Sequence, residues 1–246
     1  YTYEEYRSSI GKMALNGVEA TASMGIDTPL AVLSHEHQPL FNYFKQLFAQ
    51  VTNPPIDCIR EEIVTSTSVY VGRDGNLLEE EPKNCQVLKI NNPILTNTDM
   101  LKIKNMKVEG FKAVTVPITY YKSAPLDRAM DRLFVEVDRA HRAGANILIL
   151  SDRGVDENHV AIPSLLAVSA VHQHLVKTKK RTSLAIILES GEPREVHHFA
   201  TLLGYGACAI NPYLALDTIH ELIEEGMIKK DYYAAVEDYN HAVISG

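Results

Sequence analysis

The chain has 246 residues, of which 46% are hydrophobic and 22% are charged, and its formal net charge is −7 at pH 7. These values are typical of a globular protein and argue against a nucleic-acid partner, because binding to phosphate groups requires concentrated lysine and arginine. No apolar run approaches the ~20 residues that cross a bilayer, so no membrane partner is expected.

The three cysteines, Cys58, Cys85 and Cys208, are too far apart to supply the ligands of a zinc ion or an iron–sulfur cluster, and so few cysteines fit a reducing compartment. Paired histidines such as His172 and His174 point to different faces of a helix and cannot chelate one ion by themselves. We therefore predict no metal site. The chain begins with tyrosine rather than methionine, so we expect a segment of a longer polypeptide, although a processed terminus would look the same.

Helices and loops alternate in the first part of the chain. Residues 2–15 have apolar positions at helical spacing and predict an amphipathic helix. The following loop consists of small residues, which let another chain or a ligand approach the backbone, although a plain connector has the same composition. A helix over residues 40–48 is predicted to bury Leu40 and Phe44. Asp57 is predicted to cap another short helix.

Residues 66–122 predict an irregular β region. Strands are expected near 68–71 and 86–90, and Thr96 or Asn97 is expected to cap the helix that follows. The last ten residues of this region are rich in β-branched side chains and predict another strand. The proline within this strand, at position 117, cannot donate to a ladder, so the strand is expected at a sheet edge.

The second half of the chain alternates strands with helices. Apolar runs at 146–150, 183–188 and 207–210 each end at polar residues that precede a helical pattern. Continuous apolar runs suit strands buried on both faces, so we predict an α/β fold with a parallel β-sheet and flanking helices, starting near residue 113. The helices are predicted at 124–143, 163–176, 193–203, 212–225 and 231–244.

Polar residues stand at the expected carboxyl ends of these strands, where α/β proteins bind ligands. Asp152 and Glu189 are candidates for an acid and a base, and Arg153 for binding a carboxylate or phosphate. Ser190 and Asn211 lie at the same edge, and Asn211 is expected to cap the next helix. Strand ends are polar in any case because they face water, and the residues leave both interpretations open.

Five stretches of the chain resemble the central domain of the glutamate synthase large subunit, in the same order. They are SMGIDTPLAVLS (23–34), FAQVTNPPID (48–57), LILSDR (148–153), IPSLLAVSAVH (162–172), and ESGEPREVHH (189–198) continuing to LGYG (203–206) and NPY (211–213). Cys58 stands where this family commonly has proline, and Pro193 where alanine is usual. Neither departure suggests lost chemistry.

The resemblance implies a parent enzyme that hydrolyses glutamine in one domain, passes ammonia through a tunnel and aminates 2-oxoglutarate at reduced FMN, with an iron–sulfur cluster as a further cofactor. It implies that the central domain catalyses none of these steps and is a degenerate or incomplete TIM-barrel relative without flavin. The implied partners are the adjacent glutaminase and FMN domains, with a small subunit or a ferredoxin for the parent. The implied compartment is the bacterial cytoplasm or the plastid stroma.

We therefore hypothesise that residues 1–246 form one non-catalytic central domain that links the two catalytic domains and helps to form the ammonia tunnel. The alternative is an independent barrel-type enzyme or small-molecule binder that uses the polar strand ends. A ligand-filled cavity at these ends would favour the alternative. The candidates for tunnel or interdomain contacts are Ser23, Met24, Gly25, Asp27, Thr28, Asp152, Arg153, Glu189 and Asn211.

Overall fold

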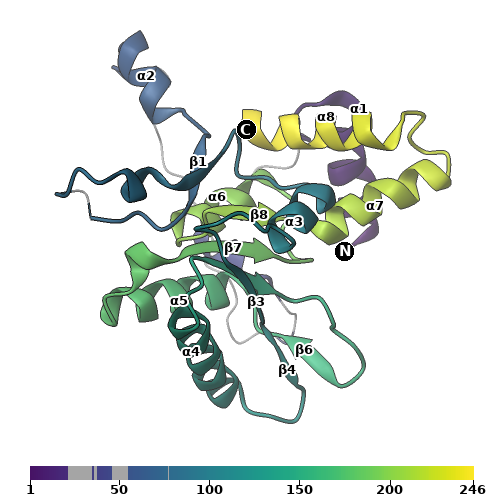
Figure 1. The fold of residues 1–246 in the computed structure, drawn as a ribbon. Coiled ribbons are helices and arrows are strands. Elements are labelled where there is room, and N and C mark those ends of the chain that lie inside the picture. Colours follow the sequence, from purple (N-terminus) through teal and green to yellow (C-terminus); the bar gives the residue numbers. More distant parts are fainter. Residues whose placement is uncertain (22–34, 36–37, 46–54, 77) are drawn as a thin grey trace.

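A four-stranded parallel sheet lies at the centre of the computed structural model, which describes residues 1–21, 35, 38–45, 55–76 and 78–246 (Figure 1). The strands lie side by side in chain order, and a helix separates each strand from the next. This is the arrangement of a parallel α/β barrel, but the described strands form an open sheet, so the barrel is incomplete. The strands are β3 (Ala113–Pro117), β5 (Ile147–Ser151), β7 (Ala185–Glu189) and β8 (Ala209–Asn211).

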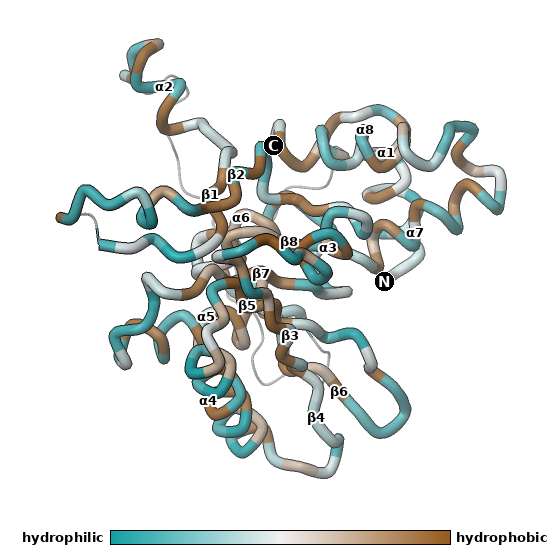
Figure 2. Tube along the Cα trace, in the orientation of Figure 1, coloured by the Kyte–Doolittle hydropathy of each residue, from teal (hydrophilic) through white to brown (hydrophobic). Residues whose placement is uncertain are grey.

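Helices cover one face of the sheet. Side chains alternate between the two faces of a strand, so Leu148 and Leu150 of β5 join the large core under these helices. Figure 2 shows the hydrophobic central strands in brown and a largely hydrophilic outer side on α4. The helices on this side are α4 (Leu126–Arg142), α5 (Ser164–Lys177), α6 (Val196–Gly204) and α7 (Tyr213–Glu224), and α8 (Tyr232–Ser245) packs against α6 and α7.

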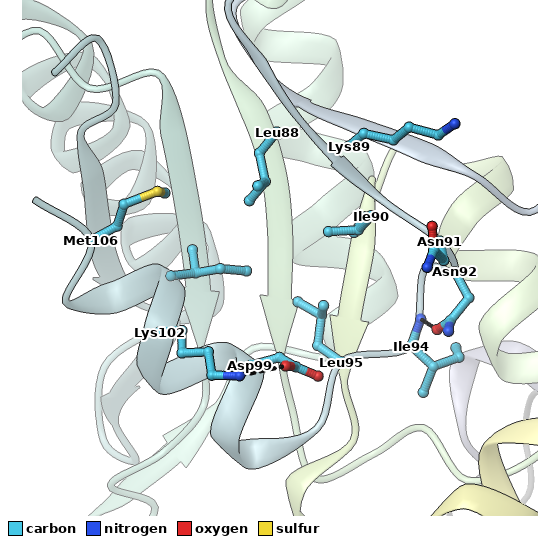
Figure 3. Close-up of a pocket in the computed structure, with 11 residues that line it drawn as sticks. Leu88, Lys89, Ile90, Asn91, Asn92, Ile94, Leu95, Asp99, Lys102 and Met106 are labelled. Atoms are coloured by element: carbon cyan, nitrogen blue, oxygen red, sulfur yellow. Dashed lines mark hydrogen bonds and ion pairs between the residues drawn. The ribbon is translucent and has the colours of Figure 1, made fainter. Parts of the chain in front are cut away.

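The opposite face of the sheet is covered by α3 (Asn97–Lys104) and by an antiparallel ribbon of β1 (Val69–Gly72) and β2 (Val87–Ile90). Ile147 and Ile149 of β5 point to this side and form a smaller core with these elements. A surface groove of about 440 Å³ remains between β2 and α3 (Figure 3). The interior of the incomplete barrel is thus filled by α3 and by the ribbon of β1 and β2.

Shorter elements complete the described part of the chain. The first π-helical turn packs against α7 and α1 packs against α8, and β4 pairs with β6 in an antiparallel ribbon. No helix in the described ranges is both long and apolar enough to cross a membrane. These elements are η1 (Glu5–Ile10), α1 (Gly11–Asn16), η2 (Leu40–Phe44), α2 (Cys58–Val64), η3 (Pro82–Cys85), β4 (Thr119–Tyr121), β6 (His159–Ala161) and η4 (Arg181–Ser183).

The α/β prediction is confirmed, and so are several local predictions. Pro117 ends β3, which is an edge strand of the four-stranded sheet. Asp57 caps α2 through hydrogen bonds from two backbone amides. Thr96, rather than Asn97, caps α3 in a capping box with Asp99. The predicted small-residue loop at 23–28 lies outside the described residues.

Two predictions of local detail are wrong. Phe41 is buried and Phe44 is 39% exposed, because η2 is a 3₁₀ helix and its tighter winding changes which residue faces the core. Asn211 does not cap α7. It is the last residue of β8, because it pairs with Glu189 at the end of β7, and Pro212 occupies the cap position.

Replacing Ile187 in the middle of β7 by alanine should lower the free energy of unfolding by about 3 kcal/mol, because it removes a fully buried side chain and leaves a cavity. The matched control is Val135→Ala on the outer side of α4, where the side chain is 52% exposed, and this change should cost no more than about 0.5 kcal/mol. Urea unfolding of both variants checks the difference. Equal midpoints would contradict the assignment of the core.

Candidate functional site

Three neighbouring strands end in a group of buried polar residues, which we call the crown: Ser151, Asp152, Glu189, Ser190 and Asn211. Each of these residues is at most 5% exposed. The strand register places Ser151 opposite Glu189, and Glu189 opposite Asn211. The structure therefore brings together the crown residues that the sequence predicts at separate strand ends.

The Glu189 carboxylate is surrounded by donors from three parts of the chain. Lys104 on α3 donates to both carboxylate oxygens at 2.8 Å, Ser151 Oγ donates at 2.5 Å, and Arg153 Nε donates at 2.9 Å. Burial alone would raise the pKa of Glu189, but these hydrogen bonds outweigh it and hold the pKa below its ordinary value. Glu189 is therefore an ionised carboxylate with its hydrogen-bonding capacity largely occupied.

Asp152 is also held by internal donors. It accepts hydrogen bonds from Ser190 Oγ at 2.5 Å, from Tyr213 OH at 2.7 Å and from the Gly191 amide at 3.1 Å. Burial raises the pKa of Asp152 despite these bonds. The guanidinium of Arg153 lies 3.9 Å from the centre of the Tyr213 ring, so one arginine connects the surroundings of Asp152 to those of Glu189.

Asn211 connects the crown to the chain that enters α3. Its Nδ2 donates to the Leu95 carbonyl at 2.9 Å and to Asn97 Oδ1 at 3.0 Å. Its own Oδ1 has no hydrogen-bond partner among the described residues. Ile94, next to these contacts, forms a parallel bridge with Ile210, so the segment before α3 continues the sheet beyond β8. The segment that enters α3 thus covers the crown on that side.

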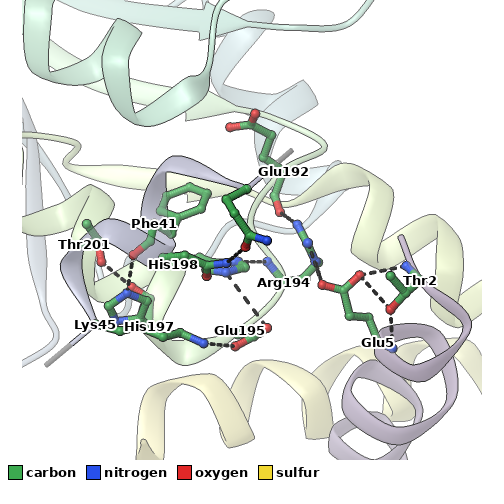
Figure 4. Close-up of polar contacts among 12 residues, drawn as sticks. Thr2, Glu5, Phe41, Lys45, Glu192, Arg194, Glu195, His197, His198 and Thr201 are labelled. Atoms are coloured by element: carbon green, nitrogen blue, oxygen red, sulfur yellow. Dashed lines mark hydrogen bonds and ion pairs between the residues drawn. The ribbon is translucent and has the colours of Figure 1, made fainter. Parts of the chain in front are cut away.

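A second buried polar cluster surrounds His198 on α6 (Figure 4). The His198 ring stacks on Phe41 with 4.4 Å between ring centres, and its Nδ1 accepts from the Arg194 amide at 3.3 Å. Arg194 pairs with Glu5 at 2.6 Å, which ties the N-terminal helix to the loop after β7. Burial, and to a lesser extent the Arg194 charge, lowers the pKa of His198 to about 3. The ring is therefore neutral near pH 7.

Both crown carboxylates are engaged by the protein itself, which leaves little capacity for a substrate. Pockets in the described part of the chain lie elsewhere, among them the groove between β2 and α3, one of about 570 Å³ at the amino-terminal end of the sheet, and one of about 540 Å³ beside η1. Within the described ranges, no group of three His, Cys, Asp or Glu side chains is placed to hold a metal ion.

Sequence reasoning missed the partners that complete the crown. Lys104 is 85 positions from Glu189, and no local pattern connects the two residues. Tyr213 lies within a stretch that matches the family, which is the only signal that could have pointed to it. Ser151 ends an apolar run and could have been grouped with Asp152 on that basis. The four predicted residues Asp152, Arg153, Glu189 and Asn211 do meet in space.

Replacing Lys104 by methionine should lower the free energy of unfolding by about 2 kcal/mol, because the buried Glu189 carboxylate then loses one of its two charged hydrogen-bond partners and keeps only Arg153. The matched control on the same helix is Lys102→Met. Lys102 lies 3.8 Å from Asp99 in an exposed pair, so its loss should cost no more than about 0.5 kcal/mol. Chemical denaturation of both variants checks this. A similar effect of the two changes would show that Glu189 does not depend on Lys104.

His198 should make the protein less stable in mild acid. The unfolded chain binds a proton at His198 below its ordinary pKa of about 6.5, whereas the folded chain does so only near pH 3, so stability falls as pH falls through this window. We expect His198→Gln to remove about 1 kcal/mol of the stability difference between pH 7 and pH 5.5. His220→Gln, at a 61% exposed side chain, is the control. Equal pH dependence in both variants would contradict the burial of a neutral ring.

All 246 residues match the family described as glutamate synthase central domain. The chain is 46% identical over its full length to part of the glutamate synthase (NADPH) large chain of Bacillus subtilis, and covers 16% of that protein. It is 38% identical over its full length to part of ferredoxin-dependent glutamate synthase 2 of Synechocystis, and covers 17% of that protein. A solved flavocytochrome b2 structure with sulfite bound is 16% identical over 64% of this chain and 36% of that chain, with a TM-score of 0.38.

The chain therefore spans about a sixth of the length of these two relatives. The family match covers the whole chain, including the crown and the small-residue stretch near the N-terminus. The chain belongs to the glutamate synthase central domain family.

Proposed function

We propose that the chain is the non-catalytic central domain of a glutamate synthase large subunit. In this proposal it joins the glutaminase domain to the FMN domain and forms part of the wall along which ammonia passes. The observation that carries the proposal is that donors of the protein itself engage both crown carboxylates. Glu189 has four hydrogen-bond contacts from Lys104, Ser151 and Arg153, and Asp152 is bound by Ser190, Tyr213 and Gly191.

Carboxylates whose hydrogen-bonding capacity is already occupied by the protein suit a structural role better than an active site. A general acid or base must reach the substrate proton directly or through one water molecule. The side chain of Glu189 is 3% exposed, and its nearest donors belong to the fold. Using it for catalysis would require breaking an ion pair that offsets the cost of burying the charge. The alternative of an independent barrel-type enzyme is therefore less well supported.

The names of the relatives support the wider assignment. They are glutamate synthases described as NADPH-, NADH- or ferredoxin-dependent, and each is several times longer than this chain. We infer that the parent of this chain makes glutamate from glutamine and 2-oxoglutarate, with FMN and an iron–sulfur cluster held outside these 246 residues. Its electron donor is bound by other parts of the enzyme. The parent then acts in a bacterial cytoplasm or a plastid stroma.

A bulky replacement at Gly25 in the intact parent enzyme tests the role in ammonia transfer. Gly25 belongs to the small-residue stretch shared with the family, and leucine there should narrow the passage or disturb its wall. We expect less glutamate formed per glutamine hydrolysed, whereas glutamate formation from added ammonia should persist. Both quantities are measured on the same preparation.

The matched control is Gly204→Leu at the end of α6, where open space surrounds the added side chain. This variant should keep the coupling of the unmodified enzyme. Unchanged coupling in Gly25→Leu would contradict the channelling role. An activity of the 246-residue chain by itself that is abolished by Glu189→Gln would support the alternative enzyme instead.

A further inference from the structure

The helix α2 stands apart from the rest of the molecule at the end of an extended segment (Figure 1). Residues 55–68, which contain α2, are all exposed. The helix is nevertheless well formed at its start, because Asp57 Oδ1 accepts hydrogen bonds from the Ile59 amide at 3.0 Å and from the Arg60 amide at 2.9 Å. It therefore has local order but no buried residue.

A helix of seven residues is not expected to be stable in water by itself. Nucleation fixes several residues for the first hydrogen bond, and isolated helices shorter than about 12 residues remain marginal even in favourable sequences. An N-cap contributes to stability but does not replace the packing of an apolar face. Because α2 is ordered although none of its residues is buried, we infer that another surface covers it.

One side of this segment is apolar. Ile59 and Ile63 are four residues apart and lie on one face of α2, and Ile56 precedes the cap Asp57, whose backbone is extended. They are 40%, 75% and 73% exposed, respectively. The acidic residues Glu61 and Glu62 lie on other sides of the helix. Such an aligned apolar group on a projecting element marks a binding surface.

We propose that Ile56, Ile59 and Ile63 dock in an apolar groove on another domain of the parent glutamate synthase chain. This inference rests on the proposed function, in which the chain is one domain of a longer enzyme. Because the chain covers 16% of its Bacillus subtilis relative and 12% of a Schizosaccharomyces pombe relative, most of such a parent lies outside the structure.

A partner in the same polypeptide fits the chemistry of this face better than a transient partner does. A covalently joined domain is held at high effective concentration, so a small face is enough to dock. Aliphatic faces without charge are typical of permanent interfaces, whereas transient ones are more polar. The helix then binds as an amphipathic helix in a groove, with the isoleucines as anchors.

Hydrogen exchange of the full-length parent tests the docking. In the unmodified enzyme, the amides of α2 should exchange at least about 100-fold more slowly than in an unstructured peptide, because burial of Ile59 and Ile63 contributes about tenfold each. The double variant Ile59→Asp and Ile63→Asp should bring these amides to nearly unstructured rates. The control variant Glu61→Gln and Glu62→Gln on the same helix should keep them slow.

Amides of β5 and β7, measured in the same samples, show whether each variant is folded, and they should be unchanged. Fast exchange of α2 in the unmodified parent would overturn the proposal. So would protection that survives the double aspartate variant, or protection that increases with protein concentration, which would indicate a second copy as the partner. Fast exchange of α2 in an unmodified parent that transfers ammonia normally would refute this inference and leave the proposed function intact.

Discussion

The burial of the Glu189 carboxylate is the constraint on which the structure at the carboxyl ends of the strands depends. A buried carboxylate without partners costs several kcal/mol, so the fold must bring donors to it. Those donors are Lys104 from α3, Ser151 from the end of β5 and Arg153 from the loop beyond it. The Glu189 carboxylate therefore connects α3, the sheet and the loop after β5.

The position of α3 that brings Lys104 to Glu189 also explains why the interior of the incomplete barrel is filled. The inner face of the sheet presents Ile147, Ile149 and Ile187, which would be exposed without a cover. Docking α3 over this face buries these side chains and carries Lys104 to the crown. Hydrophobic burial and charge pairing thus favour the same position of α3, and each supports the other.

The crown occupies the place where barrel enzymes have their active sites, yet its groups are used to hold the fold together. Arg153 pairs with Glu189 and stacks on Tyr213, which in turn binds Asp152, so the loops after β5 and β7 and the start of α7 form one connected unit. A fold of this kind can carry many functions, because function depends on how such residues are placed.

The sequence by itself determined the parallel sheet, most helices and the cap at Asp57, because these features depend on apolar periodicity and on residues close in the chain. It also indicated that Asp152, Arg153, Glu189 and Asn211 would meet at one edge. Only the tertiary structure decided that donors of the protein itself occupy the carboxylates of Asp152 and Glu189. Lys104 reaches Glu189 only because α3 packs across the sheet, and that packing is a long-range consequence of burial that no local pattern contains.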